Sequence, residues 1–203
     1  MSVIELPARL EGDLVAPPGA PGIVLFAHGH GSSRHSPRNQ AVAKALNDHD
    51  LATLLMDLHT EDEDHAELDT VVLTSRLLAA IDWVEAHEPV RRMKVGVFGA
   101  STGAAAALRA AAARPWTVAA VVTRGGSPDT ATALEMVAAP TLLIAGELDP
   151  DVVSANQQAL RQLGGPADLR VVLGATHLFP ELGAMARVTE LATDWFTTHL
   201  THH

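Results

Sequence analysis

The sequence predicts an α/β protein in which a mostly parallel sheet of about eight strands is covered by helices on both faces. Three features of the chain predict this architecture. After a pattern typical of an N-terminal hairpin, short strand-forming runs alternate with helical patterns. One run, GIVLFA at residues 22–27, is continuously apolar, as expected of a strand that is buried on both faces. Another run, at residues 94–98, turns directly into an alanine-rich helix.

Length and composition favour a single domain over residues 1–203. With 47% hydrophobic and 19% charged residues, the 203 residues can form one substantial core. The net charge of -10 argues against nucleic acid or an anionic membrane surface as a partner, and the lack of cysteine excludes disulfides and thiolate chemistry. The first residues lack a signal-peptide pattern, so we expect a cytoplasmic protein. The closing His202 and His203 resemble a cropped affinity tag and are excluded from the functional interpretation.

The first half of the chain contains clear boundary signals. The turn-rich sequence PPGAPG at residues 17–22 connects the hairpin to the apolar strand. Ser36 and Pro37 form a good N-cap and first turn for a helix, and Pro89 lies beyond the end of the next helical pattern. The expected elements of this half are a hairpin over residues 3–16 interrupted around 8–12, strands over 22–28 and 51–57, and helices over 37–48 and 70–86.

Strands and helices continue to alternate in the second half. Alanine has the highest helix propensity and little bulk, which suits a helix buried against a sheet. The expected elements are strands over residues 94–98, 117–123, 141–145 and 169–173, and helices over 104–113, 130–138, 151–163 and 183–199. The connection over residues 124–140 is short, so we expect an open site with no cap domain.

The junction GASTG at residues 99–103 predicts a nucleophile elbow, which is a sharp turn from a strand into a helix. The turn brings the neighbouring backbone close, so Gly99 and Gly103 leave room where a Cβ would not fit. Ser101 is then held in a strained conformation at a helix N-terminus, where N–H groups favour developing negative charge. The N–H of Thr102 is the obvious first donor to an oxyanion.

Two later strands end in residues that complete a catalytic set with this serine. Ligands of parallel sheets bind at the carboxyl ends of the strands, where Asp149 and His177 are expected. The chain order of Ser101, Asp149 and His177 is that of the α/β-hydrolase triad. His177 would accept the serine proton, and Asp149 would orient the imidazole. Asp149 alone could be a helix cap, and Asp151 is the competing acid.

The acidic connection over residues 57–69 raises the question of a metal site. It contains seven carboxylates together with His59 and His65. The acids are nearly contiguous, in contrast to the spaced ligands of an ion-binding loop, and this favours a solvated loop. We therefore expect neither a metal nor a cofactor.

Over almost its whole length, the chain resembles a compact α/β-hydrolase of the dienelactone-hydrolase-like family. The matching segments are FAHGHGSSRHSPRN at 26–39, GASTGAAAAL at 99–108, LLIAGELD at 142–149 and GATHLF at 174–179. The resemblance implies an acyl-enzyme mechanism with Ser101 as nucleophile, Asp149 as acid and His177 as base. It further implies an oxyanion hole formed by the N–H groups of His30 and Thr102.

Serine in place of the cysteine found in dienelactone hydrolases proper favours the hydrolysis of ordinary esters of small to medium size. His30 stands where similar chains more often carry a small residue, so its ring either narrows the mouth of the site or is an inert surface group. Arg34 and Arg124 lie on loops at the same sheet edge, where they would clamp a substrate carboxylate or serve as loop braces. Phe179, two residues after the expected base, is a further candidate for substrate contact.

Several other functions share these residues. An acyltransferase, a perhydrolase or a lactone hydrolase would use the same triad. A non-catalytic ligand-binding protein on a hydrolase scaffold is the alternative of another class, because a fold does not determine a function. Nucleotide binding is disfavoured, because the dinucleotide fingerprint needs a glycine where Arg34 stands and no Walker lysine pattern is present.

Overall fold

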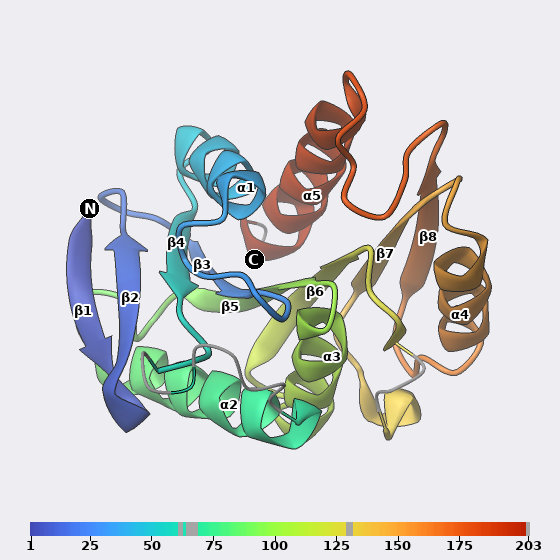
Figure 1. The fold of residues 1–203 in the computed structure, drawn as a ribbon. Coiled ribbons are helices and arrows are strands. Elements are labelled where there is room, and N and C mark those ends of the chain that lie inside the picture. Colours follow the sequence, from blue (N-terminus) through green and yellow to red (C-terminus); the bar gives the residue numbers. More distant parts are fainter. Residues whose placement is uncertain (61–62, 64–68, 129–131, 202–203) are drawn as a thin grey trace.

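A computed structural model describes residues 1–60, 63, 69–128 and 132–201, which form one eight-stranded sheet with helices on both faces (Figure 1). The strand order is β1-β2-β4-β3-β5-β6-β7-β8. The strands are β1 Ser2–Leu6, β2 Leu10–Val15, β3 Gly22–Ala27, β4 Ala52–Met56, β5 Lys94–Ala100, β6 Val118–Arg124, β7 Thr141–Gly146 and β8 Ala167–Val172. The α-helices are α1 Pro37–Asp48, α2 Thr70–Ala86, α3 Gly103–Ala113, α4 Pro150–Leu160 and α5 Ala184–Thr201.

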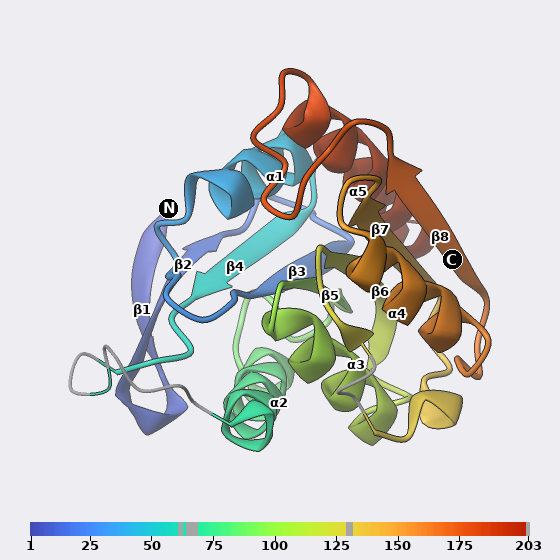
Figure 2. The same ribbon diagram turned by 45° about the vertical axis from the view of Figure 1, so that its right-hand side comes forward.

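The sheet is parallel from β4 to β8 in the strand order, and antiparallel at the two pairings that β2 makes. β1 pairs with β2, and β2 pairs with β4, in antiparallel register, whereas the other neighbouring strands are parallel. Figure 2 follows the sheet from β1 at one edge to β8 at the other. The predicted fold class is therefore confirmed, including the N-terminal hairpin and the buried strand over residues 22–27.

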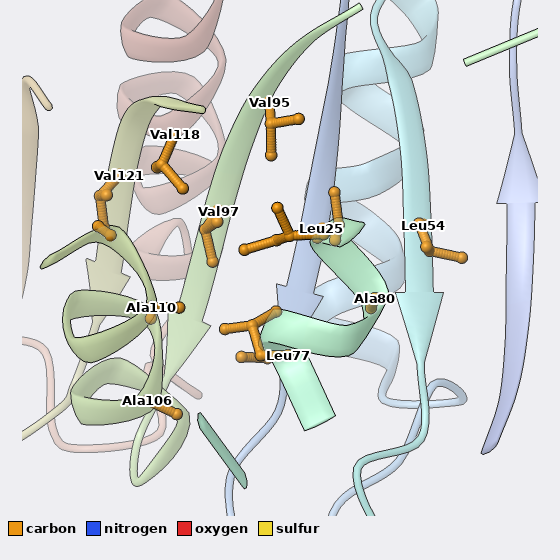
Figure 3. Packing of buried hydrophobic residues seen from close by; sticks show 14 of the residues in the cluster. Leu25, Leu54, Leu77, Ala80, Val95, Val97, Ala106, Ala110, Val118 and Val121 are labelled. Carbon is orange, nitrogen blue, oxygen red and sulfur yellow. The ribbon is translucent and has the colours of Figure 1, made fainter. Parts of the chain in front are cut away.

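Helices cover both faces of the sheet because the buried strands are apolar on both sides. α1 and α5 pack on one face, and α2, α3 and α4 pack on the other (Figure 1). Figure 3 shows Leu25 and Val97 of the sheet facing Leu77 of α2. The small side chains of Ala106 and Ala110 let α3 lie close to the same face.

Two expected elements differ from those observed. The hairpin is interrupted only by a 3-10 turn at Pro7–Arg9, because β2 already begins at Leu10. The helix expected over residues 130–138 is reduced, over the residues that are described there, to a 3-10 turn at Leu134–Met136. Ala133, which precedes that turn, has a left-handed backbone with φ of 61°, which is incompatible with a continuing α-helix.

This topology decides where a site can form. The parallel strands β3, β5, β6, β7 and β8 all end at the same edge of the sheet, so the loops that follow them converge there. No domain is inserted in the connection from Gly125 to Pro140, so the edge carries no cap. None of the helices described is long and apolar enough to cross a membrane.

Candidate active site

Ser101 lies at the junction of β5 and α3, as the sequence predicts. Its φ of 52° places its backbone in the left-handed region, which residues other than glycine rarely adopt. Residues with such strained backbone conformations are often found at functional sites. The Ser101 N–H donates to the carbonyl oxygen of Arg124 on the neighbouring strand at 3.0 Å. This bond fixes the elbow against the end of β6.

The flanking glycines are required by close approach of the backbone. A Cβ on Gly103 would lie 2.2 Å from the carbonyl oxygen of Ala27 in β3. A Cβ on Gly99 would lie 2.6 Å from the carbonyl oxygen of Gly103. Because both contacts are with backbone, a side chain could be accommodated only by moving α3 away from the sheet.

His177 connects Ser101 to Asp149. Its Nε2 lies 3.5 Å from Ser101 Oγ, and its Nδ1 lies 2.6 Å from Asp149 Oδ2. Asp149 precedes α4 but makes no side-chain cap hydrogen bond, so its carboxylate is directed to the histidine and does not cap the helix. Asp151, the competing acid, is exposed in the first turn of α4.

The loops that carry Asp149 and His177 are hydrogen-bonded to each other. The N–H of Leu148 donates to the carbonyl oxygen of Ala175 at 2.9 Å, and the N–H of Gly174 donates to Glu147 Oε2 at 2.8 Å. The His177 side chain remains 43% exposed, so small molecules from solvent can reach the imidazole.

Phe179 lies beneath this loop and does not line its surface. It is 1% exposed, and a Cβ on Gly125 would lie 3.3 Å from its Cε2. The expectation of a substrate contact is therefore corrected, because a buried ring that packs under the His177 loop supports the loop and cannot touch a ligand from solvent.

The loop after β3 lies against the elbow, and the backbone N–H of His30 in this loop already has a hydrogen-bond acceptor. The N–H of His30 donates to Thr102 Oγ1 at 2.9 Å. A Cβ on Gly29 would lie 2.8 Å from the Cβ of Ser101, which shows how closely the two segments approach. The two expected oxyanion donors thus belong to adjacent segments, with the threonine hydroxyl bonded to one of them.

Sequence reasoning missed the role of His28, which is 1% exposed. Its Nε2 accepts the N–H of Leu58 at 2.8 Å, so Nδ1 carries the proton and donates to the carbonyl oxygen of Gly29 at 2.9 Å. Burial lowers the pKa of His28, which keeps the ring neutral. The sequence signal for a buried histidine here was its position directly after a continuously apolar strand. His59 stacks on it with ring centroids 5.2 Å apart.

The carboxylates and histidines of the acidic connection, where they are described, bind arginines or remain apart from one another. Asp57 binds Arg34, and no group of three or more histidine, aspartate or glutamate side chains among the described residues could hold a metal ion. Glu63 forms a two-point ion pair with Arg76. His65 lies outside the described residues.

Arg34 and Arg124 do not form a clamp. The Arg34 guanidinium binds the carboxylates of Asp57 and Glu11, the latter at 2.5 Å, and lies 3.6 Å from Asp13. Arg34 therefore braces the loop after β3 against β2 and against Asp57, which follows β4, and this favours the brace over the clamp among the two roles expected for it.

Arg124 is in a different situation, because it is only 5% exposed. Its Nη1 contacts Met185 Sδ at 3.7 Å. Burial, together with the nearby charge of Arg38, lowers the pKa of Arg124 to about 10.

Comparisons with known proteins point to one family. The model of the dienelactone hydrolase family matches residues 45–200. Two proteins of Mycobacterium tuberculosis strains, which carry the provisional name phosphoribosyl transferase, are 47% identical over 204 residues, covering 98% of this chain and 46% of theirs. The chain therefore spans about half the length of these curated relatives.

Solved structures agree with this result. A dienelactone hydrolase from Anabaena variabilis is 50% identical, with a TM-score of 0.94 over 98% of this chain and 96% of that one. Est1E from Butyrivibrio proteoclasticus has a TM-score of 0.85 at 16% identity over both whole chains. A serine hydrolase without a lid from Xanthomonas campestris has a TM-score of 0.79 at 20% identity over 100% of this chain and 95% of that one. The last two show a shared fold only.

Proposed function

Because the chain belongs to the dienelactone hydrolase family, we propose that it is a serine hydrolase that cleaves carboxylic esters of small to medium size. The observation that carries this proposal is the pair of contacts from Ser101 Oγ to His177 Nε2 and from His177 Nδ1 to Asp149 Oδ2. A serine hydroxyl needs a base to become nucleophilic, and a base in a fixed tautomer needs an acceptor at its other nitrogen.

The proposed reaction proceeds through an acyl-enzyme. His177 Nε2 takes the hydroxyl proton of Ser101 as Oγ attacks the ester carbonyl carbon, and Asp149 stabilises the resulting imidazolium. The tetrahedral intermediate collapses when the alcohol leaves with that proton. A water molecule, deprotonated by His177, then attacks the acyl carbon and releases the acid and Ser101.

The oxyanion would be stabilised by the N–H groups of His30 and Thr102. In the structure the His30 N–H donates to Thr102 Oγ1 at 2.9 Å. The carbonyl oxygen of the substrate must therefore replace the threonine hydroxyl as the acceptor of this N–H. Rotation of the Thr102 side chain, which is exposed, makes this exchange possible without movement of the backbone.

Related reactions would use the same acyl-enzyme. In acyl transfer and perhydrolysis, an acceptor other than water attacks the acyl-enzyme. In lactone hydrolysis, the substrate is a cyclic ester. All three reactions would use the same triad. The name of the mycobacterial relatives belongs to proteins about twice as long, and no observation on the described residues favours phosphoribosyl transfer here. A ligand-binding protein without activity is disfavoured by the intact chain of triad contacts. A cytoplasmic location remains a prediction.

A panel of p-nitrophenyl esters and lactones tests the proposal directly. Wild type should turn over short acyl esters and react with a fluorophosphonate probe, whereas Ser101→Ala should lose both activities. Ser154→Ala, which removes an exposed serine on α4, is the matched control and should retain them. Turnover that persists in Ser101→Ala would show that this serine is not the nucleophile.

A further inference from the structure

β8 leaves one edge of the sheet open. It covers Ala167–Val172 and is last in the strand order, and no described strand pairs with its outer side (Figure 2). An unpaired strand edge presents a row of N–H and C=O groups to which another chain can add a strand. Natural proteins either protect such an edge or use it to bind a partner, and the residues of β8 indicate which use applies here.

The hydrogen bonds of β8 show which of its backbone groups face outward. The carbonyl oxygen of Val172 accepts the N–H of Glu147 at 3.0 Å, so Val172 and every second residue before it direct their backbone groups to β7. The residues between them, Ala167, Leu169 and Val171, direct theirs away from the sheet. In the structure the outward N–H of Leu169 donates to Oδ1 of its neighbour Asp168 at 2.8 Å. A side chain therefore stands where a partner strand would supply a carbonyl oxygen.

Two side chains of opposite charge follow each other along this edge. Asp168 and Arg170 are two residues apart, so they lie on the same face of the sheet, and they form an ion pair of 2.6 Å. Their side chains are 40% and 56% exposed, so water screens the pair and it holds them only weakly. Both residues line a groove of about 380 Å³ beside α5, which leaves space for their charged groups to turn towards a partner.

The spacing of these charges selects one register for a second copy of the chain. When two β8 strands pair antiparallel about a two-fold axis at Leu169, Asp168 of each copy lies opposite Arg170 of the other. An axis at Asp168 or at Arg170 would instead place like charges opposite each other, which destabilises a strand pair. Axes farther along the strand would leave both charges opposite uncharged residues.

The same register also satisfies the other groups of the edge. It places Leu169 opposite Leu169 and Val171 opposite Ala167, so apolar side chains meet on the face of the sheet away from the charges. These three residues are the ones whose backbone groups face outward. They would therefore exchange the hydrogen bonds of the new ladder, and the Leu169 N–H would donate to a carbonyl oxygen.

An exposed apolar surface continues from the end of β8. Leu173 is 80% exposed and Leu182 is fully exposed, and both line a hollow of about 490 Å³ together with Val171. Neighbouring apolar side chains that remain exposed often mark interaction sites. Antiparallel pairing brings Leu173 towards Gly164 and Gly165 of the other copy, which have no side chains to obstruct it. The contact would thus extend beyond the strand itself.

We propose that β8 is the interface of a homodimer in which the sheets of two copies join into one, with Leu169 on the two-fold axis. The partner is a second copy of this chain, because Asp168 and Arg170 are complementary to their own pattern read in the opposite direction. On pairing, each Asp168 carboxylate releases the Leu169 N–H and binds the partner's Arg170. The dimer goes beyond the proposed reaction and does not depend on it.

Charge reversal tests the register. In sedimentation velocity over a dilution series, wild type should reach a mass twice that of one chain at the higher concentrations. Asp168→Arg and Arg170→Asp should each raise the Kd of the dimer roughly tenfold or more, because the two-fold axis makes each change create two repulsive pairs. The double variant Asp168→Arg/Arg170→Asp restores opposite charges across the axis and should dimerise as wild type does.

A mixture of the two single variants gives the most specific test. The Asp168→Arg chain is positive at both positions of β8, and the Arg170→Asp chain is negative at both. They should form a heterodimer when mixed, although each alone is largely monomeric. Recovery of the dimer mass in the mixture also shows that both variants are folded. Charges that only protect the edge from pairing would give no heterodimer.

Lys44→Asp is the matched control. Lys44 forms an ion pair with Asp48, also at 2.6 Å, on the exposed surface of α1, which does not belong to the β8 edge. Reversing this charge alters the net charge of the chain as Arg170→Asp does. It should leave the dimer at the wild-type Kd.

Hydrogen exchange locates the interface without any variant. The amides of Ala167, Leu169 and Val171 should exchange more slowly in concentrated than in dilute wild-type protein, because pairing protects them. If neither single variant folds, this experiment decides. The proposal is overturned by a wild type that is monomeric at every concentration, by no change in exchange at β8, by single variants that dimerise normally or fail to pair when mixed, or by an equal loss in Lys44→Asp.

Discussion

Asp149 and Asp151 are two residues apart, yet their surroundings differ, and only Asp149 has the contact that the proposed mechanism requires. Asp149 Oδ2 lies 2.6 Å from His177 Nδ1, whereas Asp151 is exposed in the first turn of α4. We expect Asp149→Asn to reduce kcat for p-nitrophenyl acetate by roughly 10⁴-fold, because the amide favours the wrong tautomer of His177. Asp151→Asn should change kcat by less than about twofold, because an exposed first-turn carboxylate contributes little beyond the helix dipole. A comparable loss in both variants would contradict the assignment of the acid.

Thr102 makes a second prediction at the scale of single residues. Its hydroxyl accepts the His30 N–H at 2.9 Å. In the proposed mechanism, the substrate carbonyl displaces this hydroxyl. A hydrogen bond of this kind is worth about 1 kcal/mol net. Thr102→Ala should therefore raise kcat/KM for a small ester by up to about fivefold, as measured by initial rates. Thr102→Ser keeps the hydroxyl and should show none of this increase, whereas a loss of activity in Thr102→Ala would mean that the hydroxyl itself assists catalysis.

Elements were predictable where the local sequence decides their ends. α1 begins after the N-cap Ser36, and α2 covers the predicted residues 70–86. The segment 130–138 was not predictable in this way. The carbonyl oxygens of Leu134 and Val137 accept the N–H groups of Gly164 and Gly165, at 3.3 and 2.8 Å. These bonds join residues far apart in sequence, so tertiary contacts override the helix propensity of the segment.

The contact between α3 and β3 gives a prediction at the scale of elements. A Cβ on Gly103 would lie 2.2 Å from the carbonyl oxygen of Ala27, and rigid backbone on both sides cannot give way locally. Gly103→Ala should therefore lower the free energy of unfolding by about 2 to 4 kcal/mol, as measured by urea denaturation. Reaction with the fluorophosphonate should also be lost, because the elbow carries Ser101.

Ala112→Gly is the control for Gly103→Ala, because it changes helix propensity at the other end of α3 without creating a clash. It should cost about 1 kcal/mol of stability and leave probe labelling intact. A Gly103→Ala protein as stable as wild type would show that α3 can shift away from the sheet.

For the molecule as a whole, parallel topology explains why the sequence could predict that Ser101, Asp149 and His177 lie together. Residues that follow parallel strands meet at one edge, so Ser101, Asp149 and His177 could be grouped without knowledge of packing. The partners of Arg34 could not be predicted in this way. They include Glu11 of β2 and Asp57 after β4, and the register of β2 against β4 is a long-range antiparallel pairing. Side-chain contacts such as these depend on packing between strands distant in sequence.

The histidines predict how the stability of the whole chain depends on pH. Burial lowers the pKa values of His28, His59 and His199 below the ordinary value of 6.5. Below pH 6.5 the unfolded chain therefore binds protons at these sites before the folded chain does. The free energy of unfolding should fall as the pH decreases from 6.5 to 5, with His28 contributing at most about 1.4 kcal/mol per pH unit. The pKa of Glu63 is lowered to about 2, chiefly by hydrogen bonds from Arg76. Protonation of Glu63 therefore lowers the free energy of unfolding only below this pH range.

Urea denaturation at pH 7.5, 6.5, 5.75 and 5.0 would measure this slope in wild type and in His28→Gln. The glutamine cannot be protonated, so the variant should lose less stability over this range than wild type, whatever its stability at pH 7.5. The comparison isolates His28 because His59 and His199 are present in both proteins. Equal slopes in the two proteins, or a wild-type stability that rises towards pH 5, would mean that protonation of His28 does not destabilise the folded chain.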